Sequence, residues 1–226
     1  MRLVTWNILH GRRQGGRVDR ALLQRSCAAL RADVLGLQEV DVGTLRVGRA
    51  DLVADVAEAA EMESTFASVR SLAGGGRVGN ALLVRGRLLD SEVLPLPGRE
   101  GTERRCAAVA TAELTNGTQL SVAVCHLGIR GEGSSQLSAV IAALAERPGP
   151  HVLLGDLNLR PAKVAPTVES AGFRLVGGDL TFPADHPDRR IDHVALAGLA
   201  ESAVVTPLLP VSDHRALVVE AAPPGP

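Results

Sequence analysis

Short apolar segments that end abruptly in polar residues are the feature that most constrains how this chain folds. The clearest is HVLLGDLNLRP, residues 151–161, in which an apolar run is followed by Asp156 and Asn158. A short apolar run bounded by turn signals is typical of a strand buried on both faces. Side chains two apart in an extended chain point to the same side, so Asp156 and Asn158 can act on one point beyond the strand. The alternative is a turn in which both side chains bond their own backbone.

The rest of the chain repeats this pattern of short strands with helices between some of them. Strands are predicted at residues 2–8, 33–40, 79–84, 88–94, 107–114, 118–126, 152–155, 190–197, 202–206 and 215–220, and helices at 18–31, 50–61, 134–146 and 162–170. Asn116-Gly117 predicts a hairpin between two of these strands. Because the order is neither strict strand–helix alternation nor all-β, we predict an α/β (α+β) fold with two sheets packed together and helices outside.

Length and composition fit one reduced, globular domain. The 226 residues, 46% hydrophobic and 22% charged, predict a single domain over residues 1–221 and a disordered tail over 222–226. Three scattered cysteines indicate neither a disulfide framework nor a zinc site. The net charge of −1 gives no general basic field for nucleic acid. No signal peptide or transmembrane segment is evident, so we expect a cytoplasmic protein with no obligate protein partner.

Polar side chains stand at six of the predicted strand ends or starts. They are carboxylates, carboxamides and two imidazoles, namely Asn7, Glu39, His126, Asp156, Asn158, Asp192, Asp213 and His214. Each alone is more often a turn residue or a solvated strand end, but together they form one chemical set. Carboxylate and carboxamide oxygens suit hard cations such as Mg²⁺ or Mn²⁺, whereas zinc prefers more His or Cys. Imidazoles beside such an ion can bind a phosphoryl oxygen or protonate a leaving group.

The order of these motifs resembles that of a known superfamily. TWN, LQE, GNALL, CHL, GDLN, IDH and SDH follow one another as in the endonuclease/exonuclease/phosphatase superfamily, which has a deoxyribonuclease-I-like fold. The resemblance extends over nearly the whole chain, and GDLN and SDH at this separation are its specific part. It implies a four-layer αββα sandwich with two packed mixed β-sheets. It also implies cleavage of phosphoester bonds with Mg²⁺ or Mn²⁺.

The same resemblance implies a role for each matched residue. Asn7, Glu39 and Asp213 match the metal side of the family's site, and Asp156 matches the residue that orients or deprotonates the attacking water. The expected phosphate-binding and supporting residues are His126, Asn158 and His214, the last of these supported by Asp192. Arg105 in ERRCA and Asn80 in GNALL match further positions that we expect to bind substrate.

The sequence leaves the substrate open. Tyrosine is absent, Val78 precedes Gly79-Asn80 where relatives often have Tyr, and IDH leaves His193 as an imidazole without an assigned use. A small molecule or head group is favoured over long nucleic acid because aromatics and net basic charge are scarce. A nuclease proper remains the main alternative, since arginines cluster in three loops, and a non-catalytic phosphate-binding module is a weaker one.

Two further features of the sequence, one tripeptide and one glutamate, bear on the chemistry of the site. Ser212-Asp213-His214 holds the residue types of a serine hydrolase, but three contiguous residues cannot form a triad and no GxSxG motif is present. Glu39 ends an apolar strand without an evident basic partner nearby in the sequence. We therefore expect like-charge repulsion between Glu39 and the other carboxylates, which a divalent cation would relieve.

Overall fold

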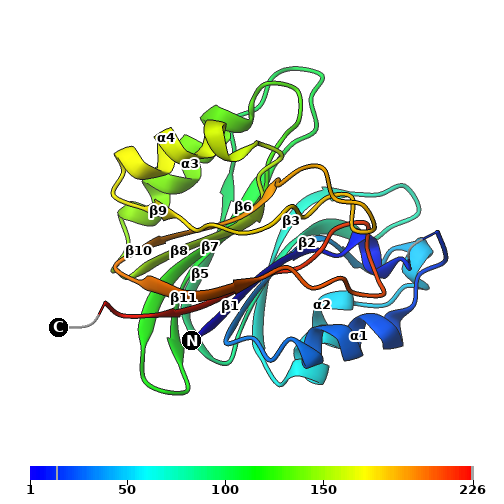
Figure 1. Ribbon diagram of the computed structural model, residues 1–226. Coiled ribbons are helices and arrows are strands. Elements are labelled where there is room, and N and C mark those ends of the chain that lie inside the picture. The colour runs from blue at the N-terminus through cyan, green and yellow to red at the C-terminus, as the bar shows by residue number, and fades with distance from the viewer. Residues whose placement is uncertain (14, 225–226) are drawn as a thin grey trace.

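Two six-stranded mixed sheets form the centre of the structure, a computed structural model that describes residues 1–13 and 15–224 (Figure 1). The first sheet has the order β11-β12-β1-β2-β4-β3, with bounds Ala200–Val205, Leu217–Ala222, Arg2–Asn7, Val34–Val42, Arg77–Val84 and Glu63–Ser71. The second has the order β5-β6-β7-β8-β10-β9, with bounds Gly86–Pro95, Cys106–Leu114, Gln119–His126, His151–Asp156, Asp192–Ala197 and Arg174–Leu175. Each sheet has one parallel pair at its centre, β1 with β2 and β7 with β8.

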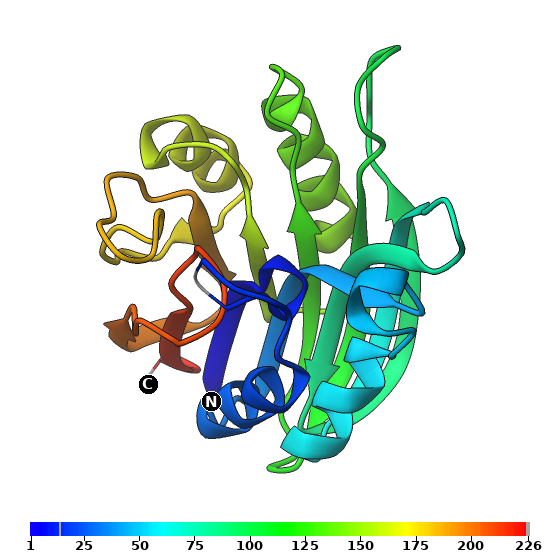
Figure 2. The same ribbon diagram turned by 90° about the vertical axis from the view of Figure 1, so that its right-hand side faces the viewer.

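Helices cover the outer face of each sheet. α1 (Arg20–Ala29) and α2 (Leu52–Ala60) lie on the first sheet, and α3 (Gly133–Ala145) and α4 (Pro161–Ser170) lie on the second (Figures 1 and 2). The first two begin at aspartate caps. The Asp19 carboxylate accepts a hydrogen bond from the backbone of Leu22, and Asp51 accepts bonds from Val53 and Ala54. Such caps satisfy backbone N–H groups that have no partner within the helix.

Three apolar layers hold the four structural layers together, and the alternation of strand side chains fills them. In β2, Val34 lies between the sheets while Leu35 and Leu37 pack under α1 and α2. In β8, Leu154 lies between the sheets while Leu153 packs under α3 and α4. Both central strands are thus apolar on both faces, which explains their continuous apolar runs.

The two sheets come into close contact at Gly36, in the middle of β2. A Cβ atom there would lie 2.9 Å from Val124 Cγ2 of β7 and 3.1 Å from Leu154 Cβ of β8. Side chains of the second sheet therefore fill the space that any other residue at position 36 would need. This contact places the central parallel pair of one sheet directly against the central pair of the other.

The carboxyl ends of the two parallel pairs consequently reach the same edge of the sandwich. β1 ends at Asn7, β7 ends at His126 and β8 ends at Asp156. In the sheet register, His126 is opposite Asp156 and Asp156 is opposite Asp192, the first residue of the antiparallel β10. Polar residues far apart in the sequence are brought together because the strands that carry them end at this edge.

The predicted fold class is confirmed, with two strands that the sequence did not indicate. These are β3 and β9, at the edges of their sheets. Ala222, predicted as the first residue of a disordered tail, is the last residue of β12, whereas residues 225–226 of that tail lie outside the described part of the chain. Among the described residues, no helix combines the length and the apolar character needed to cross a bilayer.

Replacing Gly36 with alanine tests the contact between the sheets. We expect Gly36→Ala to lower the free energy of unfolding by about 1–3 kcal/mol, because the added methyl overpacks the interface. Urea denaturation measures this. Gly177→Ala is the matched control, since a Cβ atom at that position would meet no atom within 4 Å. Equal stability of the two variants would show that the sheets tolerate a wider spacing.

Candidate active site

A cleft of about 390 Å³ opens at the edge where the strands end. Eight of the ten residues predicted from sequence line it: Asn7, Glu39, Arg105, His126, Asp156, Asn158, Asp213 and His214. Asp192 is fully buried behind His214. Asn80 lines a neighbouring cavity instead, and its side-chain amide donates to the backbone carbonyl of Cys106 over 2.8 Å.

Asn7 joins the two sheets at the base of the cleft. Its Nδ2 donates to Glu39 Oε1 over 3.3 Å and to Asp156 Oδ2 over 3.1 Å, while its Oδ1 accepts from the backbone N–H of Leu9 over 3.1 Å. These three bonds fix the orientation of the amide, since Oδ1 can only accept and Nδ2 only donate. Asn7 therefore holds one carboxylate from each sheet in a set position.

Glu39 reaches the cleft because β2 is irregular at that point. The register of β2 against β4 shifts between Leu37 and Val40, and Glu39 has a φ of 56°. Regular alternation after Leu35 and Leu37 would send Glu39 into the apolar layer under α1 and α2, where Val40 lies instead. A bulge of this kind re-aims a side chain, and a left-handed non-glycine residue is uncommon enough to suggest a functional constraint.

His10 is a site residue that the sequence did not identify. Its Nε2 lies 3.0 Å from Glu39 Oε2 and its Nδ1 lies 2.9 Å from Asp41 Oδ1. The Asp41 side chain is fully buried and accepts two bonds from Arg46, of 2.5 and 2.7 Å. The side chains that follow one another from the cleft, with alternating charge, are thus Glu39, His10, Asp41 and Arg46. The only sequence signal was a histidine five residues after the start of the motif TWN, in a loop otherwise read as Gly/Arg-rich.

This series of side chains corrects the expectation that Glu39 lacks a basic partner. Burial lowers the pKa of His10, but its hydrogen bonds to Asp41 and Glu39 outweigh this, so the net pKa is raised. Burial would raise the pKa of Glu39, yet the hydrogen bond from His10 and the positive charges nearby lower it to about 2. The charge of Glu39 is therefore stabilised within the protein itself.

The DLN segment forms a tight turn and contributes to the cleft at the same time. The Asp156 Oδ1 atom accepts a hydrogen bond from the backbone N–H of Asn158 over 3.1 Å. This is the bond expected from the alternative of a turn in which the side chain bonds its own backbone. Asn158 has a φ of 51°, and its Nδ2 donates to the carbonyl of Leu127 over 3.0 Å. Both side chains line the cleft, but the turn brings them there, and not the alternation of an extended strand.

His214 is held by three parts of the chain. Its Nδ1 is 2.9 Å from Asp192 Oδ2, its backbone carbonyl accepts from the Trp6 indole over 3.0 Å, and its backbone N–H donates to Ser212 Oγ over 3.1 Å. Burial lowers the pKa of His214, but the charge and hydrogen bond of Asp192 raise it to about 9. This raised pKa favours the protonated imidazole at neutral pH. Its Nε2 lies 3.8 Å from Asp156 Oδ2.

His126 has the opposite protonation state. Burial and the positive charge of Arg105 lower its pKa to about 3, so this imidazole is neutral. Its Nε2 lies 3.4 Å from Asp156 Oδ2. Burial and the nearby charge of Asp192 raise the pKa of Asp156 to about 7, which suits a group that exchanges a proton near neutral pH.

Ser212 and His193, two further polar residues near the cleft, each bond a backbone carbonyl of another segment. Ser212 Oγ donates to the backbone carbonyl of Asn7 over 2.5 Å, so it is committed to a turn and is not a nucleophile. His193 Nε2 bonds the carbonyl of Leu159 over 2.7 Å and burial lowers its pKa to about 4. Its imidazole supports the loop after β8 and takes no part in the cleft.

Comparison with known proteins identifies the family. The sequence profile described as the Endonuclease/Exonuclease/phosphatase family matches residues 4–214. The chain belongs to the endonuclease/exonuclease/phosphatase family. Members of this family are hydrolases that act on phosphoesters, and the motif order predicted from sequence is confirmed by the match.

Solved structures show the same fold. An endonuclease/exonuclease/phosphatase from Beutenbergia cavernae has a TM-score of 0.79 and 21% identity over 100% of this chain and 72% of its own. A mannosyl-6-phosphatase of Bacteroides thetaiotaomicron has a TM-score of 0.78 and 15% identity over 98% and 99%. TDP2 of D. rerio, complexed with a single-strand DNA product, has a TM-score of 0.75 and 20% identity over 98% of each chain.

A curated relative matches part of the chain in sequence. The UPF0294 protein VV2535 of Vibrio vulnificus is 32% identical over 96 residues, which are 39% of this chain and 33% of that protein. The match thus spans about a third of the relative's length.

The difference in pKa between the imidazoles of His214 and His193 can be measured directly. In protein treated with EDTA, we expect the His214 imidazole to titrate near pH 9, because Asp192 stabilises its charged form. Asp192→Asn should lower that pKa. ¹H–¹⁵N NMR of the imidazole nitrogens measures both, and His193, which burial keeps neutral, is the internal control. A wild-type His214 that titrates near its ordinary pKa of about 6.5 would contradict the assigned pair.

Proposed function

We propose that this protein is a divalent-metal-dependent phosphoesterase that hydrolyses a phosphodiester or phosphomonoester of a small molecule or head group by attack of water. The observation that carries the proposal is the placement of a charged imidazole, His214 on Asp192, beside the Asp156 carboxylate in one cleft. A positive donor and a carboxylate of raised pKa are the two groups that water attack on a phosphoryl centre requires.

Two carboxylates that line the cleft, Glu39 and Asp213, fit a hard divalent cation. Glu39 and Asp213 both line the cleft, and Asp213 Oδ1 is buried without a hydrogen-bond partner among residues 1–13 and 15–224. Carboxylate oxygens of this kind suit Mg²⁺ or Mn²⁺. Glu39 and Asp213 would hold the ion, with Asn7 fixing the position of Glu39. When bound, such an ion supplies Lewis-acid polarisation of a phosphoryl oxygen.

A second group of potential ligands is less suitable. Asp156, Asp192 and His214 each offer one ligand atom, and these atoms lie within 4.8 Å of one another. However, His214 shares a hydrogen bond with Asp192 and its raised pKa favours the protonated ring. A histidine that binds a metal ion must have a neutral imidazole ring. We therefore assign these three residues to proton and phosphate chemistry.

The cleft residues then divide the reaction between them. Asp156 accepts a proton from the attacking water at its Oδ2, the atom that faces both imidazoles. The charged Nε2–H of His214 and the neutral ring of His126 bind phosphoryl oxygens. Asn158 and Arg105 border the same space and stabilise the charge that develops there.

The surface around the cleft favours a compact substrate over long nucleic acid. Several arginines that a nuclease would use are already occupied: Arg13 pairs with Asp19, Arg46 with Asp41, and Arg189 with Asp188. Arg190 bonds two backbone carbonyls. Apart from the two imidazoles, Phe182 is the one aromatic side chain among the described residues that line the cleft, and its ring packs 4.6 Å from His214, centroid to centroid. Such a surface provides little base stacking or phosphate neutralisation.

A substrate panel tests the proposed function. With Mg²⁺ or Mn²⁺ we expect hydrolysis of small esters such as bis-p-nitrophenyl phosphate, weak or no cleavage of plasmid DNA, and no activity in excess EDTA. His214→Ala should lower turnover at least about a hundredfold, since it removes one transition-state donor. His186→Ala, an exposed histidine outside the cleft, is the control. Activity that persists in EDTA, or near-normal turnover of folded His214→Ala protein, would refute the proposal.

Metal binding gives a readout that does not depend on turnover. Millimolar Mg²⁺ or Mn²⁺ should raise the melting temperature of the wild type, because a ligand that binds only the folded state stabilises it. Glu39→Gln should lose most of this rise. Without metal, Glu39→Gln should melt below the wild type, since the folded protein stabilises the charged form of Glu39.

Glu58→Gln on the exposed face of α2 is the matched control for this measurement. It removes the same charge away from the cleft and should keep the full metal-induced rise. If Glu39→Gln also keeps the full rise, Glu39 is not a ligand and the metal site lies elsewhere in the cleft.

A further inference from the structure

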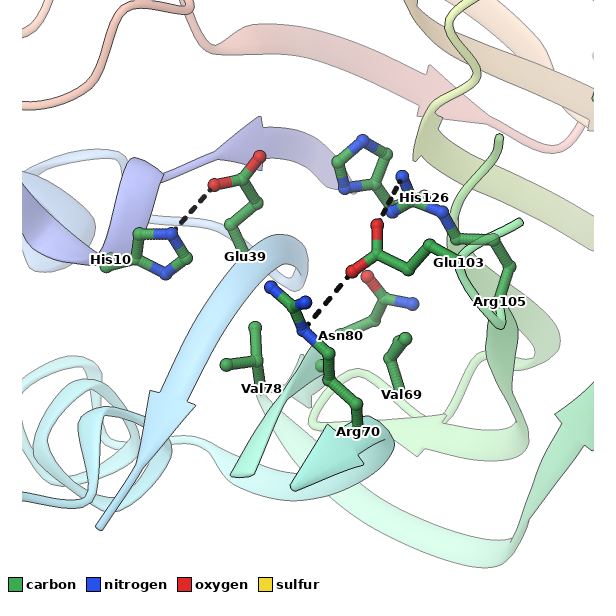
Figure 3. A pocket seen from close by; sticks show the side chains of 10 residues that line it. His10, Glu39, Val69, Arg70, Val78, Asn80, Glu103, Arg105 and His126 are labelled. Carbon is green, nitrogen blue, oxygen red and sulfur yellow. Dashed lines mark ion pairs between the residues drawn. The ribbon is translucent and has the colours of Figure 1, made fainter. Parts of the chain in front are cut away.

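A second cavity of about 110 Å³ adjoins the cleft (Figure 3). Glu39, Arg105 and His126 line both spaces, so the two are continuous. The other side chains around this side cavity are His10, from the turn after β1, and five from β3, β4 and the loop between β5 and β6: Val69, Arg70, Val78, Asn80 and Glu103. Nothing in the proposed chemistry uses Arg70 or Glu103.

The side cavity lies where the leaving group of the proposed reaction would go. Asp156, which receives the proton of the attacking water, lines the cleft but not the side cavity. His126 stands between them, with its Nε2 3.4 Å from Asp156 and its ring also in the wall of the side cavity. In an in-line displacement the attacking and leaving oxygens are on opposite sides of phosphorus. Attack from the Asp156 side therefore expels the alcohol toward the side cavity.

The wall of the side cavity contains one carboxylate held between two guanidinium groups. Arg70 Nε is 3.2 Å from Glu103 Oε1, and Arg105 Nη2 is 3.1 Å from Glu103 Oε2 (Figure 3). Arg105 is nearly buried, with 12% of its side chain exposed, and its Nε has no hydrogen-bond partner among the described residues. Glu103 is more exposed, at 40%, and comes from a loop. Arg70 is exposed as well, at 53%. One nearly buried cation and one exposed cation thus bind an anion that the protein supplies from a partly exposed loop.

The same wall excludes other kinds of leaving group. Its apolar part is Val69 and Val78, and the aromatic rings among its described lining residues are the imidazoles of His10 and His126. A base would lack a Phe, Tyr or Trp ring for stacking, and a quaternary ammonium group would lack the Phe, Tyr or Trp face that binds it. A volume of about 110 Å³ admits only a few non-hydrogen atoms beyond the ester oxygen.

We infer that the side cavity selects phosphoesters whose leaving alcohol carries a second anionic group, a carboxylate or a phosphate, which binds Arg70 and Arg105 in place of Glu103. This inference rests on the proposed function, because it identifies the side cavity by the direction of water attack. Glu103 is then an internal competitor of the substrate. Removing its charge strengthens binding of the second anion, whereas removing the charge of Arg70 weakens it.

Binding of two matched compounds tests the inference. 3-Phosphoglycerate and glycerol 3-phosphate differ only in a carboxylate or a hydroxymethyl group on the leaving alcohol. Isothermal titration calorimetry with Mg²⁺, on full-length Asp156→Asn protein in which the proposed base is removed, gives affinities without turnover. We expect 3-phosphoglycerate to bind about three- to tenfold more tightly, the size of effect that a partly exposed charged pair provides.

Three added substitutions separate the inference from simpler explanations. Arg70→Gln should abolish the preference for 3-phosphoglycerate, and Glu103→Gln should increase it. Arg104→Gln removes the same charge from an exposed residue that does not line the side cavity, and should leave the preference unchanged. A purely structural brace between Glu103 and the arginines would instead make Glu103→Gln and Arg70→Gln change binding in the same direction.

Each other outcome overturns the inference. Equal affinity for the two compounds, failure of both to bind, or a preference that survives Arg70→Gln would show that no second anion binds here. The proposed function fails separately, when wild-type protein with Mg²⁺ or Mn²⁺ hydrolyses no ester of the substrate panel. The binding preference is measured without hydrolysis, so the two failures are distinguishable.

Discussion

The close packing of β2 against β7 and β8 is the constraint on which the site depends. Gly36 permits this approach, since a side chain there would collide with Val124 and Leu154. Because β1–β2 and β7–β8 are the parallel pairs of their sheets, their carboxyl ends reach the same edge. The side chains that line the cleft are thus positioned by two strand pairs packed against each other, and interiors of high packing density are rigid.

Asn7, at the end of β1, connects this packing to the two carboxylates Glu39 and Asp156. One Nδ2 bonds Glu39 from the first sheet and Asp156 from the second. The two sheets therefore set the separation of these two carboxylates, and a single amide bridges them without adding charge.

Much of this architecture was predictable because central strands and strand ends have strong local signals. Buried strands such as β8 are apolar throughout, and Asp156 and His214 stand out against that background. Edge strands have weaker signals: in β3 only Ala67 is fully buried, and its other positions are mixed. No pattern predicts the bulge at Glu39, because it depends on pairing with β4 and on the layer that Val40 fills.

The role of His10 was hidden for a related reason. It follows β1 in a short irregular turn with a φ of 58°, and its partners lie about thirty residues further on. Sequence spacing indicates which side chains share a strand, but not which loop returns to a neighbouring strand's end. Arg70 and Glu103 escaped prediction in the same way, since β3 and the loop before β6 meet only in the folded protein.

The two cleft imidazoles show how the fold gives one residue type two functions. His126 and His214 are both buried, and burial disfavours the charged form of each. Asp192 reverses this for His214, whereas His126 has Arg105 beside it and stays neutral. The position of Asp192 at the start of β10, opposite Asp156 in the register, is what makes the difference. The register of β10 thus decides whether the charged form of His214 is stabilised. A shift of β10 by one residue would move Asp192 away from His214, although both residues would still be present in the sequence.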